Sequence, residues 1–540
     1  MSDAAAPASS ARQRGILGFI ERTGDRLPDP VMIFIWLIVF VFALSAIAAG
    51  LGWNAVNPAS QETISATSLF TSANLERLIV EMPRTLTGFA PLGYVLLVML
   101  GAGLAERSGL FGAAMRAAVK DAPKFLLTPL VIFVGIMANQ AADAAYVVLI
   151  PLAGVLFAAA GRHPIVGIAA GFAGVAGGFS ANLLPGQLDA LLLGITEPAA
   201  RLLVPDWTMN VAGNWYFIAA MAFFFTPVAW FVTDVIIAPR FGKWEPGPDA
   251  PPIQTADSAL TDSEKKGLRA AGLAALAIAL VFAVLTIPAL WTNEYWAIEG
   301  GAPLYDEEKL AEGQPEQAMS PFYHGLVAAF FLLFLVCGIA YGRAAGVNKN
   351  HRDEIKMISD GMATMAYYIV LAFAAAHFVA LFNWSNLGAI TAIHGAQFLR
   401  GTGLPLPALL AGLVILGTTI NLFVGSASAK WGMLAPVLVP MFMLLGVSPE
   451  MTTAAYRVGD SVTNPITPLM VYFPLVLTFC QRWDPRFGMG GLMAAMIPYS
   501  LYFLIAGVAM TIGWVYLDLP LGPGATVGYE MPGVTAPATP

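Results

Sequence analysis

The sequence predicts an all-α polytopic membrane protein, and three observations support this prediction. Of the 540 residues, 58% are hydrophobic and only 11% are charged, whereas about a quarter of an average globular chain is charged. Many apolar runs reach the roughly 20 residues that one membrane-spanning helix needs. Two further apolar stretches are interrupted by small polar residues and belong to an internal repeat. We therefore expect nine transmembrane helices plus two re-entrant hairpins, arranged as an inverted repeat.

The composition also argues against other classes of protein. A water-exposed surface needs about a quarter to a third of its residues charged, so we expect neither a cytosolic enzyme nor a disordered chain. The net charge of -7 argues against a nucleic-acid partner. Cys337 and Cys480 lie in apolar runs and suggest neither disulfides nor a transition-metal site. There is no phosphate-binding loop, and we expect no cofactor.

Nine apolar runs are long enough to cross a bilayer. The first, Val31 to Leu51, follows four arginines and exceeds the 7 to 15 residues of a signal-peptide core, so we expect a retained span. The other runs lie at about 86–105, 165–196, 213–237, 267–290, 322–342, 360–382, 452–479 and 490–516.

Two apolar stretches, 124–161 and 404–446, are each broken in the middle by small polar residues. The first break runs from Asn139 to Asp143, and the second from Gly425 to Lys430. Each half has about 15 residues, which is too short for a span. We expect re-entrant hairpins whose tips are buried in protein or line a cavity.

The positive charges fit this topology, because lysine and arginine collect in cytoplasmic loops. With a cytoplasmic N-terminus, 20 of the 27 lysines and arginines lie inside and five outside, and only Lys430 and Arg457 remain in the membrane. The first hairpin then opens from the cytoplasm and the second from the outside. The C-terminal tail after Leu519 is expected to be periplasmic and loose, because it is rich in proline and glycine.

An internal repeat supports the inverted arrangement. A shift of 285 residues gives ten identities over the 33 positions from Ala142 to Gly174, and it matches Tyr146 with Trp431. After a three-residue gap, residues 180–182 align with 462–464, and each segment precedes a proline-containing break. Each repeat is thus a hairpin plus a broken helix, the pattern typical of secondary transporters.

The repeat divides the chain into expected segments. These are 1–30, a cytoplasmic N-terminal segment; 31–122, scaffold spans 1–2; 123–210, the first repeat core with hairpin 1 and broken span 3; 211–400, scaffold spans 4–7; 401–482, the second repeat core with hairpin 2 and broken span 8; 483–517, span 9; and 518–540, the periplasmic tail. We expect an elevator-type ion-transporter-like fold, in which the two repeat cores move as a unit against the scaffold.

The breaks concentrate the candidate binding groups. Half-helix N-termini attract anions, and freed carbonyl and side-chain oxygens can hold Na⁺. Polar residues that lie at the breaks are Ser180, Asn182, Ser426, Ser428, Thr463, Asn464 and Thr467. Any single one could equally satisfy a helix end, but the clustered set favours binding.

Charged residues inside a membrane are costly and usually functional. After the loop residues are set aside, five charged residues remain within the membrane, namely Asp143, Asp189, Lys430, Arg457 and Asp460. Arg457 and Asp460 share one helix face and could pair with each other. Asp189 is a candidate proton or cation site, with pairing to Lys430 or Arg457 as the alternative. Lys430 could contact an anion beside Trp431, or merely be a helix-end charge; Asp143 could merely cap a helix.

These segments resemble a known family. The strings Ser426-Ala-Ser428-Ala-Lys430-Trp431, Ala454 to Asn464 and Thr467-Pro468-Leu469 are similar to the AbgT family of aminobenzoyl-glutamate transporters. Residues 143–152 and 178–183 of the first repeat resemble it too, and the similarity extends from about Arg22 to Asp518.

The resemblance implies a homodimeric carrier of the bacterial inner membrane, related in fold to divalent-anion/sodium symporters. It also implies p-aminobenzoyl-glutamate uptake, or export of sulfonamide-like antimetabolites, driven by an ion gradient. The positions that match the family's functional residues are Asp189, Ser428, Trp431, Pro449, Arg457, Asp460 and Pro468.

Together these arguments predict an ion-coupled secondary transporter of small molecules. The expected substrate-binding residues are Ser428, Lys430, Trp431, Arg457, Asn464, Ser180 and Asn182. The expected ion-coupling residues, for Na⁺ or H⁺, are Asp189, Asp460, Asn182, Asn464 and Thr463. Pro449, Pro468 and Pro185 are expected to shape the helix breaks. The alternatives are a Na⁺-coupled dicarboxylate importer and, from another class, an intramembrane enzyme.

Overall fold

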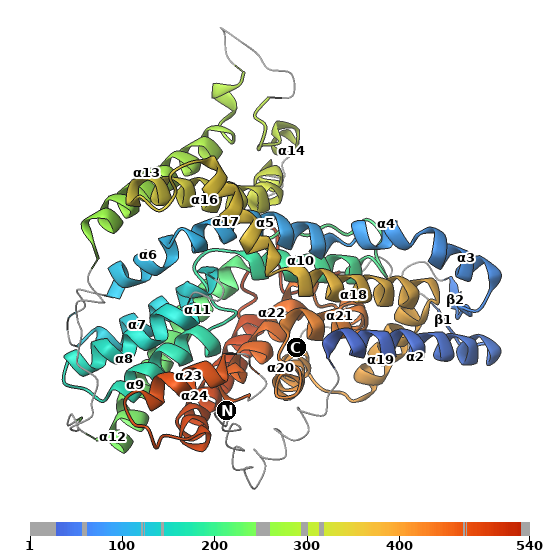
Figure 1. Ribbon diagram of the computed structural model, residues 1–540. Helices are drawn as coiled ribbons and strands as arrows, with labels where there is room; N and C mark the ends of the chain where they lie inside the picture. The colour runs from blue at the N-terminus through green and yellow to red at the C-terminus, as the bar shows by residue number, and fades with distance from the viewer. Residues whose placement is uncertain are drawn as a thin grey trace, which may run out of the picture.

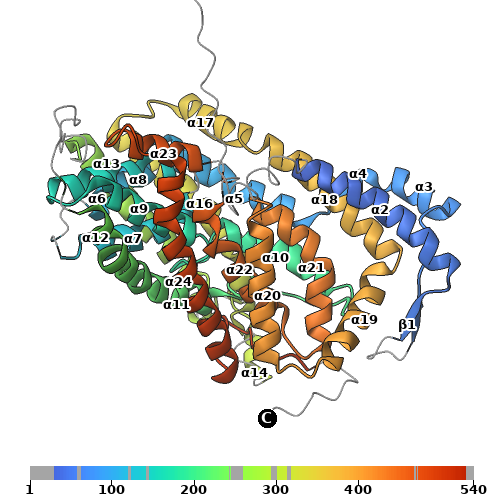
Figure 2. The same ribbon diagram turned by 90° about the horizontal axis from the view of Figure 1, so that it is seen from below.

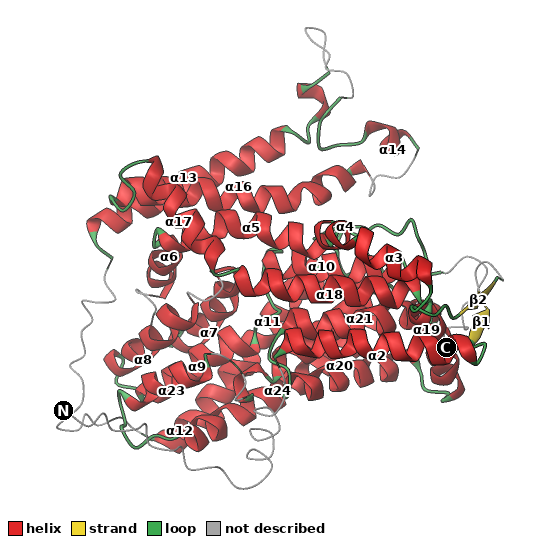
Figure 3. Cartoon of the chain, turned by 45° about the vertical axis from the view of Figure 1, so that its right-hand side comes forward, coloured by secondary structure: helices red, strands yellow, loops and turns green. Residues whose placement is uncertain are grey.

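The chain is built almost entirely of helices (Figure 3). The computed structural model describes residues 29–56, 62–119, 123, 125–141, 145–242, 244, 260–292, 301–312, 318–467, 470 and 472–530. Within these residues the only sheet is a short antiparallel hairpin of β1 (Asn54–Val56) and β2 (Thr63–Ser65). The prediction of a helical protein is therefore confirmed.

Seven helices of the described chain are long and apolar enough to cross a membrane. They are α2 (Pro30–Gly50), the continuous stretch Trp215–Phe241, α13 (Asp262–Val284), α16 (Ser320–Ala345), α18 (Ala366–Trp384), α21 (Ala427–Leu444) and α24 (Met489–Tyr516). The stretch Trp215–Phe241 comprises α11 (Trp215–Phe231), a π-helical turn η4 (Val232–Ile237) and α12 (Ala238–Phe241). An eighth span would combine α5 (Ala90–Arg107) with α6 (Leu110–Val119), which are bent by 65°. The polytopic character is confirmed, and the count of nine stays a prediction.

Shorter helices complete the scaffold. They are α3 (Ser72–Val80), α4 (Met82–Thr87), η6 (Pro288–Leu290), α14 (Glu307–Ala311), α17 (His351–Ala363) and α19 (Leu387–Gly401). In Figures 1 and 2, α13 and α16 lie along one flank beside α5, while α2 packs beside α18 on another.

The first repeat contains two interruptions. Its first apolar stretch forms α7 (Leu127–Met137) and η1 (Ala138–Ala141), followed by η2 (Ala145–Leu149) and α8 (Ile150–Ala159). Next come α9 (Pro164–Phe172) and a π-helical turn η3 (Ala173–Gly177), and nine residues separate η3 from α10 (Gln187–Ala200). The non-helical segment between η3 and α10 contains Pro185. It corresponds to the proline-containing break expected from the sequence. Asp143 lies outside the described residues.

The second repeat shows the same order of elements. α20 (Leu406–Asn421) and α21 are separated by a short non-helical segment, and α22 (Pro449–Val462), η7 (Asn464–Ile466) and α23 (Phe473–Gln481) follow. A Pro at N1 suits a helix start, because its missing N–H is unpaired there anyway, and Pro449 occupies this position in α22. Pro468 lies outside the described residues. The re-entrant nature of the two hairpins stays a prediction.

The C-terminal tail differs from its prediction. Leu521, Ala525 and Val527 are buried, and the amides of Tyr216 and Phe217 donate to the carbonyl of Leu521 at 2.9 and 3.2 Å. The expectation of a loose tail is therefore wrong for residues up to 530. Its apolar residues find a buried surface, and its backbone bonds to the start of α11.

Helix α22 is buried along its entire length and packs closely on α20. A Cβ atom added to Gly459 would lie 2.4 Å from the carbonyl oxygen of Val414 and 2.9 Å from the amide of Thr418. Both atoms belong to the backbone of α20, which cannot shift without displacing the helix. Glycine at this position is what permits the close approach of the two helices.

We expect Gly459→Ala to destabilise the protein, because overpacking of a tight core costs about 1 to 3 kcal/mol. The measurement is thermal unfolding of the purified protein in detergent. Gly412→Ala on α20 is the matched control, since a Cβ there meets nothing within 4 Å. Equal melting temperatures for the two variants would show that the close approach of α20 and α22 does not exist.

Candidate functional site

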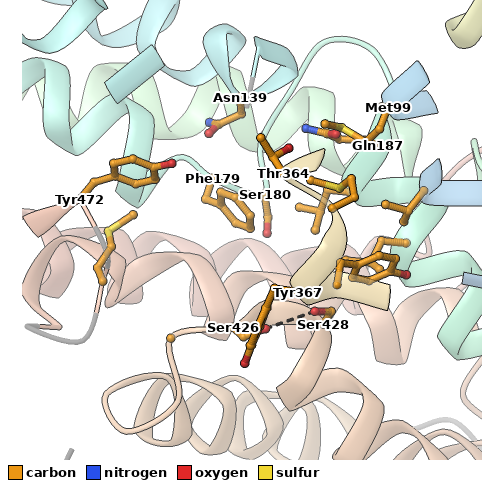
Figure 4. Close-up of a pocket in the computed structure, with 18 of the residues that line it drawn as sticks. Met99, Asn139, Phe179, Ser180, Gln187, Thr364, Tyr367, Ser426, Ser428 and Tyr472 are labelled. Carbon is orange, nitrogen blue, oxygen red and sulfur yellow. Dashed lines mark hydrogen bonds between the residues drawn. The ribbon is translucent and has the colours of Figure 1, made fainter. Parts of the chain in front are cut away.

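A cavity of about 840 Å³ lies between the two repeats and the scaffold. The repeats contribute Ser180 and Asn182 from the first break and Ser426 and Ser428 from the second. In Figure 4, Ser180 lies on the opposite side of the cavity from the Ser426–Ser428 pair, whose hydroxyls are 3.2 Å apart. The volume is in the usual range for small-molecule sites, so the predicted breaks do meet at a space that can hold a ligand.

The cavity is lined by groups of three kinds. Scaffold and repeat residues provide an aromatic and thioether surface, which includes Phe179, Tyr146, Tyr472, Tyr367, Met99 and Met365. The breaks provide hydroxyl and amide groups, and a positive charge comes from Arg457. This combination of an apolar wall with a few convergent polar groups suits an amphiphilic organic ligand.

Arg457 forms an ion pair between the repeats. Its Nη1 lies 2.6 Å from Oδ1 of Asp189, and the two side chains are only 3% and 6% exposed. Its Nη2 also donates to the carbonyl oxygen of Ser180 at 3.3 Å. The second carboxylate oxygen of Asp189 accepts from the amide of Gly186 at 2.7 Å, at the start of α10. The pair thus joins the middle of α22 to the break of the first repeat.

A second buried pair joins Lys430 to Asp460, whose side chains are 1% and 2% exposed. The ammonium of Lys430 also contacts Oδ1 of Asn421. Asn421 in turn donates to the carbonyl of Asp460 at 2.6 Å, to the hydroxyl of Thr463 at 3.0 Å and to Oδ1 of Asn464 at 2.8 Å. Because each group has a partner, this network can remain charged without water.

Trp431 is part of a packed chain behind the cavity. Its ring stacks on Tyr456 with a centroid distance of 4.3 Å, and its Nε1 donates to the hydroxyl of Thr196 at 2.8 Å. The hydroxyl of Tyr456 donates to Oδ1 of Asp460 at 3.1 Å. Trp431 is completely buried, so in this conformation it presents no face to a ligand. Trp431 was expected to bind the substrate, but the aromatic surface of the cavity is formed by other residues.

The charged residues pair differently from the first expectation. Spacing along α22 suggested a pair between Arg457 and Asp460, but each finds a partner on another helix. The alternative weighed for Asp189, pairing with Arg457, is what the structure shows. A pair three residues apart on one helix would leave Asp189 and Lys430 buried without a counter-ion, which costs more than the crossed arrangement.

The predicted site residues fall into two layers. Those that line the cavity are Ser180, Asn182, Asp189, Ser428 and Arg457. Those buried behind this surface are Lys430, Trp431, Asp460, Thr463 and Asn464. Lys430 is therefore not an exposed anion contact in this conformation, because Asp460 and Asn421 enclose its ammonium.

Sequence reasoning missed several members of the buried layer. Asn421 connects four of its residues, and Ser461 accepts from the amide of Ser180 at 3.0 Å and donates to the carbonyl of Arg457 at 2.9 Å. Asn421 was detectable as a lone amide at the end of an apolar half-hairpin. Thr196 and Tyr456 carried no signal, because isolated Thr and Tyr residues are common in membrane helices.

Comparisons with known proteins find similar sequences and structures over nearly the whole chain. A family model described as "AbgT putative transporter family" matches residues 15–529. The p-aminobenzoyl-glutamate transport protein of Escherichia coli strain K12 is 35% identical over 517 residues, which cover 96% of this chain and 97% of that protein.

Two solved structures are similar throughout. The YdaH transporter of Alcanivorax borkumensis, described as having an unusual topology, is 41% identical, with a TM-score of 0.82 and coverage of 92% of this chain and 100% of that chain. MtrF of Neisseria gonorrhoeae, described as illuminating a class of antimetabolite efflux pumps, is 39% identical, with a TM-score of 0.84 and coverage of 95% and 100%.

The crossed ion pairs can be tested by double-mutant cycles on thermal stability. Removing one partner leaves a buried charge, so Asp189→Asn or Arg457→Met alone should cost about 3 to 5 kcal/mol. The double variant should cost clearly less than the sum, and the same should hold for Lys430→Met with Asp460→Asn.

The cycle of Arg457→Met with Asp460→Asn is the matched control, because these residues lie on one helix but do not pair. A larger coupling energy in this control cycle than in the other two would contradict the observed pairing.

Proposed function

The chain belongs to the AbgT family of membrane transporters, and on this premise we propose that it is an ion-coupled secondary transporter of small aromatic or carboxylate-bearing molecules. As a family member it is a multi-pass membrane transporter and not an enzyme. The proposed substrates are p-aminobenzoyl-glutamate and sulfonamide-like antimetabolites. The observation that carries this proposal is the buried Arg457–Asp189 pair, which lines the 840 Å³ cavity at the junction of the two broken helices.

The chemistry of the cavity supports this class of substrate. A carboxylate prefers a guanidinium, which can donate two parallel hydrogen bonds to it, and Arg457 is the buried guanidinium available. The tyrosine, phenylalanine and methionine side chains of the wall suit an aromatic ring. Amide and hydroxyl groups of Asn182, Ser180 and Ser428 can satisfy the polar atoms between ring and carboxylate.

Ion coupling follows from competition for charged groups. A substrate carboxylate that pairs with Arg457 displaces Asp189, whose charge must then be neutralised by a proton or a Na⁺ ion. Asp460 is the second candidate, because it is buried beside Asn464 and Thr463 and depends on Lys430 for its counter-charge. In both cases substrate and ion bind in linked steps, which is what gradient-driven transport requires.

The cavity lies where an elevator-type movement would need it. One wall comes from the repeats, and the other from scaffold elements, with Pro30 and Ile33 from α2 and Tyr367 and Tyr368 from α18. We propose that both repeat cores, each with a re-entrant hairpin, move as a unit against a scaffold that forms a homodimer. The complete protein would then have nine spans.

The orientation follows from the sorting of the positive charges. We propose a location in the bacterial inner membrane, with a cytoplasmic N-terminus and a periplasmic C-terminus. Asp29, Glu106 and Arg107 line the cavity, and the helix ends that carry them are cytoplasmic in the proposed topology. This supports the proposal that the cavity opens toward the cytoplasm in the present conformation.

We expect Arg457→Ala and Asp460→Ala to reduce gradient-driven transport of p-aminobenzoyl-glutamate in proteoliposomes by roughly tenfold or more, because each loses at least one charge-assisted contact of several kcal/mol. Uptake and efflux are measured under imposed H⁺ or Na⁺ gradients, with sulfonamide and succinate as competing ligands.

Arg77→Ala is the matched control, since this arginine is half-exposed and paired with Glu81 on the surface. Flux at the wild-type level in both site variants would refute the assignment. Transport of succinate in preference to aromatic carboxylates would favour the dicarboxylate importer.

A further inference from the structure

A second, much smaller cavity adjoins the Arg457–Asp189 pair. Its volume is about 20 Å³, which is room for about one water molecule. Asp189 and Arg457 line both cavities, so the ion pair separates the large one from the small one. Glu450, Thr196, Thr453 and Asn214 also line the small cavity.

Glu450 is an unusual acid. It lies in the first turn of α22 and is only 7% exposed. Among the described residues no salt bridge reaches it, and Asn214 donates to its backbone carbonyl, at 2.9 Å, and not to its carboxyl group. A buried carboxyl group without a counter-ion can hold a proton, because burial disfavours its charged form.

The charged groups around Glu450 do not neutralise it. Glu197 of α10 is a charged group that acts on it, and Glu197 is itself negative. Glu197 is paired with Arg201 and accepts from the amide of Met209 at 3.1 Å. Arg457, on the same helix as Glu450, is paired with Asp189. A cation that could hold Glu450 permanently as a carboxylate is therefore not among its described neighbours.

Glu450 is not the N-cap of α22, although its carboxyl group bonds to its own backbone amide in the first turn. The N-cap of α22 is Ser448, whose hydroxyl already accepts from the amide of Met451 at 3.0 Å. A second observation points to a bridging molecule in the small cavity. Nε of Arg457, which lines that cavity, is buried and has no hydrogen-bond partner among the described residues. One water molecule there would satisfy Nε and connect Glu450 with Asp189.

In the proposed topology, Glu450 lies on the periplasmic side of the protein, opposite the cytoplasmic opening of the large cavity. The loop between α10 and α11, which contributes Asn210 and Asn214 to the small cavity, is periplasmic in the proposed topology. The C-terminal tail covers the same end, because the amide of Ser448 donates to the carbonyl of Val527 at 3.0 Å and Asn210 donates to that of Pro523 at 3.2 Å. The small cavity thus continues from the ion pair toward the outside.

We propose that Glu450 is the acid through which the transporter exchanges its coupling proton with the outside. This inference rests on the proposed function and names the proton as the coupling ion. A proton from the outside binds the Glu450 carboxylate and passes through the water in the small cavity to the Asp189 carboxylate. Glu450 is thereby returned to its charged form. Protonated Asp189 releases Arg457 for a substrate carboxylate, and the proton later leaves into the large cavity.

The test is Glu450→Gln, which keeps the size of the side chain but cannot exchange a proton. Wild type and variant are reconstituted in proteoliposomes with p-aminobenzoyl-glutamate as the probe. We expect counterflow without an ion gradient to stay within about twofold of wild type. Transport driven by a pH gradient, and substrate-driven proton movement reported by a pH-sensitive dye, should fall by roughly tenfold or more.

Asp206→Asn is the matched control, because Asp206 is an exposed acid in the same outer loop, and it should behave like wild type in both assays. Glu450→Asp should regain part of the proton movement. Gradient-driven transport at the wild-type level in Glu450→Gln would overturn the inference, and so would equal loss of counterflow and gradient-driven transport in a variant that melts like wild type.

Coupling of the wild type to Na⁺ alone would also overturn it, although the proposed function would survive. If the wild type instead moves none of the proposed substrates under any gradient, the proposed function fails and the inference fails with it.

Discussion

The constraint on which the rest of the structure depends is the cost of charge in a dry interior. Four charged side chains form two ion pairs deep within the repeat cores, and each is at most 6% exposed. An unpaired charge there would cost several kcal/mol, so the fold must bring each one to a partner. The pair of Arg457 with Asp189 can form only if α22 of the second repeat meets the break of the first. The meeting of the two breaks is therefore an electrostatic requirement as well as a packing result.

The same constraint explains why the site has two layers. Lys430, Asp460 and Asn421 form a closed network that satisfies its own charges and holds the second break in place. Arg457 and Asp189 form a pair that borders two cavities. A closed network favours a single geometry, whereas a pair beside a cavity can exchange one partner for a ligand. In this account the Arg457–Asp189 pair, which lines the cavity, binds the substrate. The buried network around Lys430 holds the second break in position.

Much of this arrangement could be predicted from the sequence. Composition and apolar runs predicted a helical membrane protein, and the shared strings at residues 142–174 and 427–459 predicted two similar repeats with breaks. The sequence could not decide between the possible ion pairs, because Arg457 and Asp460 are neighbours on one helix face and only the tertiary fold shows that each pairs with a residue of another helix. The burial of Trp431 against Tyr456 and Thr196 was also hidden, since an aromatic residue beside a lysine looks the same whether it faces a ligand or the core. The tail beyond Leu519 was expected to be loose from its glycine and proline content, but a few apolar residues anchor it.

The central claim is that a substrate carboxylate replaces Asp189 as the partner of Arg457. The most direct measurement is a structure of the protein with p-aminobenzoyl-glutamate bound. The account predicts a substrate carboxylate within about 3 Å of the Arg457 guanidinium, with the bond between Arg457 and Asp189 broken and the aromatic ring against the tyrosine wall. A substrate bound elsewhere in the cavity, with that ion pair intact, would contradict it.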